Sequence, residues 1–140
     1  MSWSVVGHTF QRTLRWSRED IARFAREVGD GNPLHHDESY ATRTRFGTLI
    51  ASGAQPVAVL IAMCGSQATC ESPGVGLEFA FRLVGPAKPD DTIVFLWKVT
   101  DAQWSDRLGG TVVTLQGNAV GSDGRPIVTA TAKTLALDAL

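Results

Sequence analysis

The chain has 140 residues, of which 44% are apolar and 19% charged, fractions that are typical of one globular domain. Thirteen Lys and Arg residues nearly balance 14 Asp and Glu residues, so the formal net charge is −1. Without a strongly basic field to hold a phosphate backbone, a nucleic-acid partner is not expected. No apolar run is long enough to span a membrane, and residues 1–10 lack the pattern of a secretory signal. We therefore expect a cytoplasmic protein with no membrane partner.

The first predicted helix covers residues 18–28, after a segment around residues 10–16 that alternates like a strand. Ser17 is a suitable N-cap, and Gly29 is placed to end the helix. Four apolar residues fall at positions i, i+3, i+4 and i+7 and form one face: Ile21, Phe24, Ala25 and Val28. The next segment, residues 30–37, is rich in turn formers and polar side chains and predicts a loop.

A second helix is predicted from Gly53 to about Ala68, followed by four β-rich segments. The helix is apolar on nearly every face, with no charge between Arg45 and Glu71, which predicts burial on all sides. The strands are expected at residues 75–83, 92–100, 110–120 and 127–137, with a turn at residues 122–125. The two cysteines, Cys64 and Cys70, match neither a zinc pair nor a redox C-x-x-C motif, so we expect reduced thiols packed in the core.

This order of elements predicts a single α+β domain over residues 1–140. An antiparallel sheet with its helices on one face buries most apolar surface by curling around the central helix, which is the hot-dog architecture. Such a sheet leaves an exposed edge strand, and pairing of edges across a two-fold axis covers it. We therefore expect a homodimer, which could associate further.

The loop after the first helix carries a specific motif. Gly29, Asp30, Asn32, Pro33 and His35 match five positions of the pattern G-D-x-N-P-x-H. This stretch resembles the signature of the MaoC-like hydratases and dehydratases, the family of the (R)-specific enoyl-CoA hydratases. The resemblance implies a hot-dog fold, a thioester of coenzyme A or acyl-carrier protein as substrate, and reversible addition of water to the 2,3 double bond. It also implies Asp30 and His35 as the catalytic pair, with no cofactor beyond the CoA of the substrate.

Hydration of an enoyl thioester requires one group that takes a proton from water and one that returns a proton to the α-carbon, and a carboxylate and an imidazole suit these roles. The Asn32-Pro33 turn is expected to be scaffold that holds Asp30 and His35 on one face of the double bond, which predicts syn addition. Partial burial is expected to raise the pKa of Asp30 toward neutrality. For His36 and Asp37 we expect positions that face solvent or cap a helix.

A metal site is the competing interpretation of this loop, because carboxylates and imidazoles at short spacing can bind a metal. An EF-hand requires glycine at the sixth position and a carboxylate at the twelfth, which are His35 and Ala41 here. Adjacent histidines, His35 and His36, also lack the i, i+4 spacing of helical zinc sites. We therefore expect no metal.

The start of the second helix is the other half of the predicted site. Backbone N–H groups at a helix N-terminus stabilise charge on a thioester oxygen, and glycine allows close approach, so Gly53 is the candidate oxyanion donor. Ser52 is expected to bind substrate or to act as an N-cap. The related hydratases usually carry His-Gly here and a small hydroxyl residue in place of Val28. Both departures point away from a straight-chain enoyl-CoA.

Four cations are candidates for contacts with the phosphates of coenzyme A: Arg43, Arg45, Arg82 and Lys88. Surface arginines are usually solvated, so each also has a purely structural interpretation. Two alternative functions stay open: a hot-dog thioesterase, which would release free thiol, and a non-catalytic acyl-CoA binding module, which would turn nothing over.

Overall fold

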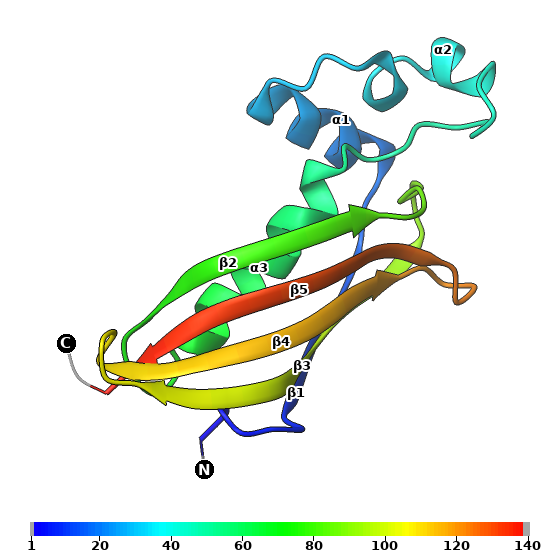
Figure 1. The fold of residues 1–140 in the computed structure, drawn as a ribbon. Coiled ribbons are helices and arrows are strands. Elements are labelled where there is room, and N and C mark those ends of the chain that lie inside the picture. The colour runs from blue at the N-terminus through cyan, green and yellow to red at the C-terminus, as the bar shows by residue number, and fades with distance from the viewer. Residues whose placement is uncertain (1, 139–140) are drawn as a thin grey trace.

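A five-stranded antiparallel sheet and one long helix form the body of the protein (Figure 1). The computed structural model describes residues 2–138. In chain order the elements are β1 (Thr9–Arg15), α1 (Arg18–Val28), the 3₁₀ turn η1 (Pro33–His35), α2 (Glu38–Thr42), α3 (Ala54–Ala68), β2 (Gly74–Leu83), β3 (Thr92–Ser105), β4 (Gly110–Val120) and β5 (Pro126–Leu137).

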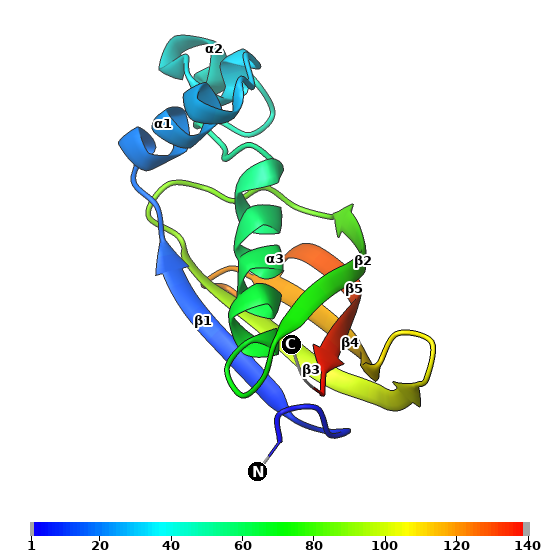
Figure 2. The same cartoon turned by 90° about the vertical axis from the view of Figure 1, so that its left-hand side faces the viewer.

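The strands lie in the order β1-β3-β4-β5-β2, and every neighbouring pair is antiparallel. The sheet curls around α3, with β1 and β2 as its two edges (Figure 2). This is the hot-dog architecture, so the predicted fold is confirmed. β3 runs five residues beyond its predicted end, because a register shift between Val99 and Asp101 lets the strand continue pairing with β4 as far as Ser105.

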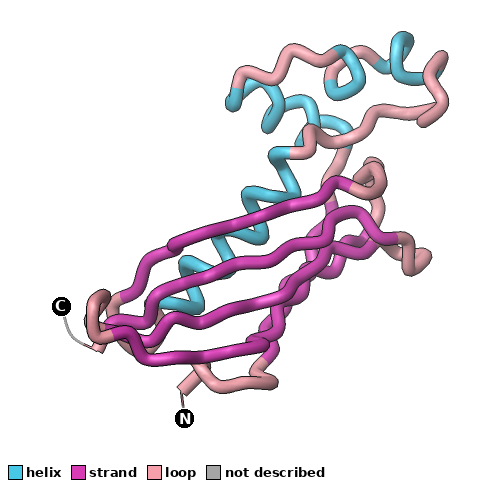
Figure 3. The backbone as a smooth tube through the Cα atoms, viewed as in Figure 1, coloured by secondary structure: helices cyan, strands magenta, loops and turns pink. Residues whose placement is uncertain are grey.

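Helix α1 has the predicted boundaries, because a capping box fixes its start and a left-handed glycine fixes its end. Ser17 and Asp20 form a capping box, in which the Ser17 side chain accepts from the Asp20 N–H and the Asp20 carboxylate accepts from the Ser17 N–H. At the other end Gly29 adopts the left-handed conformation with φ 79°, which ends the helix and turns the chain into the motif loop. The segment from α1 to α2 lies beyond one end of the sheet, above the start of α3 (Figure 3).

The core lies between the sheet and one side of α3. Trp97 is fully buried there, and its indole N–H donates to the Leu60 carbonyl at 3.0 Å, which ties β3 to the helix. Gly117 lies opposite Trp97 in β4. A Cβ atom at Gly117 would come within 2.4 Å of the Trp97 ring, so the missing side chain provides the space for the indole.

The prediction that this helix is buried on all sides is wrong. Ala54, Ala58, Ile61 and Gly65 are exposed, because the sheet covers only one side of α3. Small and uncharged residues are tolerated on a surface, so the absence of charge did not require burial. Among residues 2–138, no helix combines the length and the apolar character that a membrane crossing needs.

The two cysteines lie in different environments. Cys64 is buried in the core, as predicted, and burial raises the pKa of its thiol to about 12. Cys70 is exposed and lies two residues after the end of α3, so the prediction of a core position is wrong for Cys70.

The Trp97 packing predicts opposite effects for the same substitution at two glycines. Gly117→Ala should destabilise the fold by about 1–3 kcal/mol, because the added methyl group overpacks the core against the indole. Gly65→Ala in α3 meets no atom within 4 Å and should stabilise the helix by about 0.5–1 kcal/mol. Urea unfolding measures both changes. Equal midpoints for the two variants would contradict this account of Gly117.

Candidate active site

A pocket of about 600 Å³ lies where the motif loop meets the start of α3 and the ends of β2 and β5. Its walls are mostly apolar and include Leu34, Phe46, Ile50, Leu83 and Ile127. The polar side of the pocket carries Asp30 and His35, so two groups able to exchange protons face an apolar chamber. This combination is typical of a small-molecule site.

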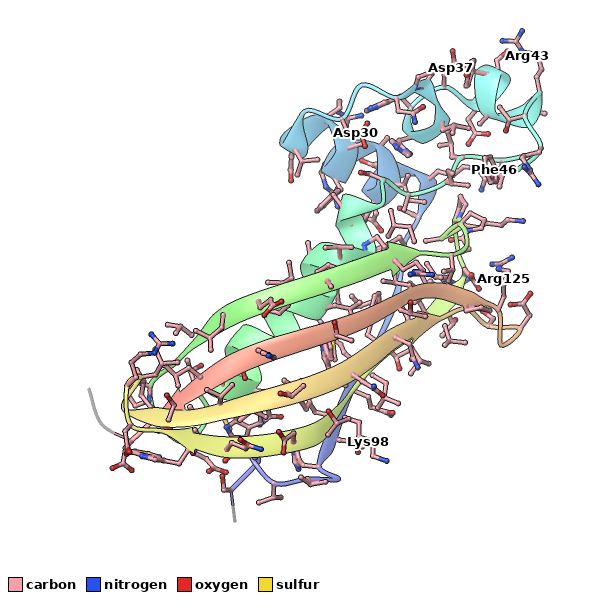
Figure 4. The ribbon with its side chains drawn as sticks, in the orientation of Figure 1. Asp30, Asp37, Arg43, Phe46, Lys98 and Arg125 are labelled. Carbon is pink, nitrogen blue, oxygen red and sulfur yellow. The ribbon has the colours of Figure 1, made fainter. Side chains whose placement is uncertain are left out.

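Three polar contacts hold the Asp30 carboxylate. Oδ1 accepts from the Asn32 N–H at 3.1 Å, and Oδ2 accepts from the Ser52 hydroxyl at 2.7 Å. Oδ2 also lies 3.2 Å from His35 Nε2. The Asp30 side chain is 31% exposed, and Figure 4 shows it between the motif loop and the start of α3. The carboxylate is therefore fixed in orientation and still reachable from the pocket.

The His35 imidazole is buried and is held from behind. Its Nδ1 lies 2.6 Å from the Ile50 carbonyl oxygen. A carbonyl oxygen only accepts hydrogen bonds, so Nδ1 carries a hydrogen and donates it. Nε2 is then the nitrogen that faces Asp30 and can exchange a proton.

The pKa of Asp30 is lowered, so the expected rise toward neutrality is wrong. The main cause is the hydrogen bond from the Ser52 side chain, followed by the backbone hydrogen bond from Asn32. Desolvation acts in the opposite direction, and coulombic attraction to the His35 and His36 imidazoles in their protonated forms adds to the lowering. Asp30 is thus maintained as a carboxylate.

Gly53 rather than Ser52 is the N-cap of α3, and Ser52 does not line the pocket but contacts Asp30. The Ser52 hydroxyl donates to Asp30, and its oxygen lies 3.3 Å from the Ala54 N–H, so Ser52 joins the carboxylate to the first turn of α3. Gly53 lines the pocket at the helix N-cap. Within residues 2–138, no acceptor pairs with the Gly53 N–H, which leaves this donor available to a ligand.

The remaining motif residues shape the loop. Gly29 provides the left-handed turn before Asp30, and the Asn32 side chain accepts from the Leu34 N–H at 3.0 Å. Pro33 is the first residue of η1, and the single turn of η1 places His35 at the pocket. The sequence does not predict the Ile50 carbonyl as the partner of His35, because no local pattern identifies a backbone acceptor 15 residues away.

The next two residues, His36 and Asp37, face different directions. Asp37 caps α2, where its side chain accepts from the Tyr40 N–H at 3.0 Å. His36 is the C-cap of η1, as one of the two expectations has it, and its backbone N–H donates to the Pro33 carbonyl. The other expectation, that its side chain faces solvent, is wrong. The imidazole turns inward, and its Nε2 lies 2.6 Å from the backbone oxygen of Asp30.

Of the four candidate cations, only Arg45 lines this pocket. Arg43, labelled in Figure 4, is the exposed C-cap of α2, and its guanidinium lies over the Tyr40 ring. Arg82 lines a separate hollow on the outer face of the sheet, beside Lys98. Lys88 does not line the pocket. Desolvation acts to raise the pKa of the half-buried Asp91 carboxyl, but the hydrogen bonds from Ser122 and the charges of Arg125 and Lys88 together lower it.

Two further features bear on substrate and metal. Val28 is 53% exposed and does not line the pocket, so this departure from the usual motif does not alter the chamber. In the part of the chain that the structure describes, no three His, Cys, Asp or Glu side chains converge as a metal site would require. The Asp30–His35 loop therefore does not present a preformed ligand set.

The family model described as the MaoC like domain matches residues 5–119, which include the motif loop, α3 and most of the sheet. The chain belongs to the MaoC-like family. The match extends well beyond the seven-residue motif and covers both halves of the pocket, the Asp30 loop and the start of α3.

Two solved structures and one curated relative that are similar to this MaoC-like domain are described as hydratases or as a dehydratase. The (R)-hydratase from A. caviae involved in PHA biosynthesis shares the fold with a TM-score of 0.83 and 24% identity over 94% of this chain and 96% of that chain. The R-hydratase PhaJ1 from Pseudomonas aeruginosa has a TM-score of 0.81 and 25% identity over 95% and 82%. A 3-hydroxybutyryl-CoA dehydratase of Methylorubrum extorquens is 41% identical over 51 residues, which are 36% of this chain and only 32% of that protein.

Ser52→Ala should raise the pKa of Asp30 in this MaoC-like domain. The substitution removes the hydrogen bond that contributes most to the lowering, so the carboxylate should take up a proton at higher pH as acid is added. NMR titration of the Asp30 side-chain carboxyl carbon measures the change. Ser39→Ala on the exposed face of α2 is the matched control. An unchanged Asp30 titration in Ser52→Ala would contradict the assigned cause.

Proposed function

We propose that this MaoC-like domain is a hydro-lyase that adds water reversibly to a 2-enoyl thioester and gives the (R)-3-hydroxyacyl thioester. The observation that carries the proposal is the 3.2 Å contact between His35 Nε2 and Asp30 Oδ2 on the polar side of an apolar pocket. Membership of the family and the likeness to (R)-hydratases support the same reaction.

The acid–base step uses Asp30 and His35 together. A water molecule held between Asp30 Oδ2 and His35 Nε2 loses one proton to the pair as its oxygen bonds to C3 of the substrate. The pair returns one proton to C2, so one water is added and no net proton is consumed. Since both groups approach from one side, the hydrogen and the hydroxyl add to the same face of the double bond. This chemistry requires no cofactor and no metal.

The thioester carbonyl takes up negative charge as water adds, and Gly53 meets that charge. Its N–H is free within the described residues and lies at the N-terminal, positive end of the 15-residue helix α3. Because Gly53 has no side chain, a substrate carbonyl can approach the backbone closely. The donor and the Asp30–His35 pair border the same pocket, as simultaneous action on C1 and C3 requires.

The substrate class follows from the pocket walls. Apolar residues such as Leu34, Phe46 and Ile50 fit an acyl chain, while Arg45 offers a cation for a phosphate of coenzyme A or of the acyl-carrier-protein arm. A thioesterase or a non-catalytic acyl-CoA binding module would use the same pocket. Release of free thiol would identify the first, and binding without turnover the second.

Asp30→Asn should lower the hydration rate by about 10²- to 10⁴-fold, because the amide cannot accept the proton of water. Loss of the enoyl-thioester ultraviolet absorbance measures the rate, and a free-thiol assay runs in parallel. Asp37→Asn is the matched control in the same segment, since asparagine also caps a helix and the rate should stay at the wild-type level. Near-normal turnover in Asp30→Asn would remove Asp30 from the mechanism.

We propose further that the protein is a homodimer joined along β2. The other sheet edge, β1, carries charged and polar side chains such as Arg12 and Thr13, which discourage edge pairing. β2 and the residue after it instead expose large apolar side chains: Val75, Leu77, Leu83 and Val84. An apolar sheet edge of this kind needs a partner, and pairing of two β2 strands across a two-fold axis supplies one.

Leu77→Lys should convert the dimer to a monomer, because a charge on the apolar edge opposes pairing of the two strands. Sedimentation equilibrium measures the mass in solution. Thr13→Lys places the same charge on the β1 edge and should leave the dimer intact. A monomeric wild-type protein, or dissociation by Thr13→Lys alone, would contradict the assignment of β2.

A further inference from the structure

His36 is a half-buried imidazole beside the catalytic pair that the proposed mechanism does not use. Its Nε2 lies 2.6 Å from the backbone oxygen of Asp30. Because that oxygen can only accept, Nε2 carries the hydrogen and donates it. The contact therefore fixes the tautomer of His36 and closes the loop between Asp30 and His36 into a ring.

Asp30 is held from both sides of its backbone. On one side, its N–H donates to the Ala25 carbonyl of α1 at 2.8 Å. On the other side, its carbonyl accepts from His36. The neighbours of Asp30, Gly29 and Gly31, have no side chains that restrict the backbone on either side of it. The His36 contact thus sets where the Cα atom of Asp30 lies.

The position of that Cα atom decides whether the carboxylate reaches its two partners. Oδ2 must lie within hydrogen-bond distance of the Ser52 hydroxyl and of His35 Nε2 at the same time. Ser52 and His35 are fixed by other elements, namely the start of α3 and the Ile50 carbonyl. A shift of the loop would therefore separate Asp30 from both partners, whereas the apolar walls of the pocket would be unaffected.

We infer that His36 is a positioning residue that holds the Asp30 backbone so that the Asp30–His35 pair meets across one water. The inference rests on the proposed hydration and adds a residue to it. His36 does not touch the reacting atoms. Its imidazole packs edge-on to that of His35, with ring centroids 6.4 Å apart, and its hydrogen bond is directed away from the carboxylate, to the main chain.

The kinetic test compares two substitutions at position 36. His36→Leu keeps the bulk but removes the donor, and should lower kcat by about 10- to 100-fold with little change in KM, because misplacement of a reacting group by about 1 Å costs up to that factor. His36→Gln keeps an N–H donor and should restore kcat to within about threefold of the wild type. His8→Leu, before β1, is the matched control and should leave both constants unchanged.

A second measurement does not depend on activity. Nitrogen-15 NMR of the imidazoles should show His36 as the tautomer with hydrogen on Nε2, with the signal assigned by its loss in His36→Gln. Absence of hydration by the wild type would overturn the proposed function, while this tautomer would still support the contact. An active wild type with wild-type kcat in His36→Leu, or a His36 with hydrogen on Nδ1 alone, would overturn the inference.

Discussion

The hydrogen bond from Ser52 to Asp30 is the contact on which the candidate site depends. It joins residues 22 positions apart, one in the loop after α1 and one at the start of α3, at 2.7 Å. The other hydrogen bonds from this loop toward α3 stop at Ile50, in the segment before the helix: the Ile50 N–H donates to the Leu34 carbonyl, and His35 Nδ1 donates to the Ile50 carbonyl. Through it, the carboxylate is oriented toward His35 and kept ionised, and one residue later comes the Gly53 N–H, which has no acceptor among residues 2–138.

The rest of the fold holds the motif loop and the start of α3 in place. The sheet packs against one side of α3 through buried residues such as Trp97. The Trp97 indole N–H donates to the Leu60 carbonyl of α3, and Gly117 leaves space for the ring. This packing fixes the N-terminus of α3 relative to the C-terminal end of β2 and the start of β5, which form the opposite wall of the pocket. Helix α1 ends at Gly29, and the motif loop that follows lies next to the N-terminus of α3. A rigid scaffold thus holds a site made mostly of loop residues.

The sequence predicted the elements well because their signals are local. The cap at Ser17, the stop at Gly29 and the β-rich segments predicted α1, β2, β4 and β5 close to their observed bounds, whereas β3 continues beyond its predicted end. The motif likewise identified Asp30 and His35, which the structure brings to 3.2 Å. The predictions that were wrong concern features set by contacts outside a short window of sequence. These features are the lowered pKa of Asp30, the inward turn of the His36 side chain and the exposed side of α3. No pattern within a short window encodes which backbone oxygen an imidazole will find.

The central claim is that Asp30 and His35 add water to one face of an enoyl thioester. Its most direct test is hydration of a short 2-enoyl-CoA in D₂O, with the product analysed by proton NMR and chiral separation. The account predicts a single deuterium at C2, on the same side as the new hydroxyl, and only the (R)-3-hydroxyacyl product. Release of free coenzyme A, a mixture of C2 epimers, or the (S)-product would contradict it.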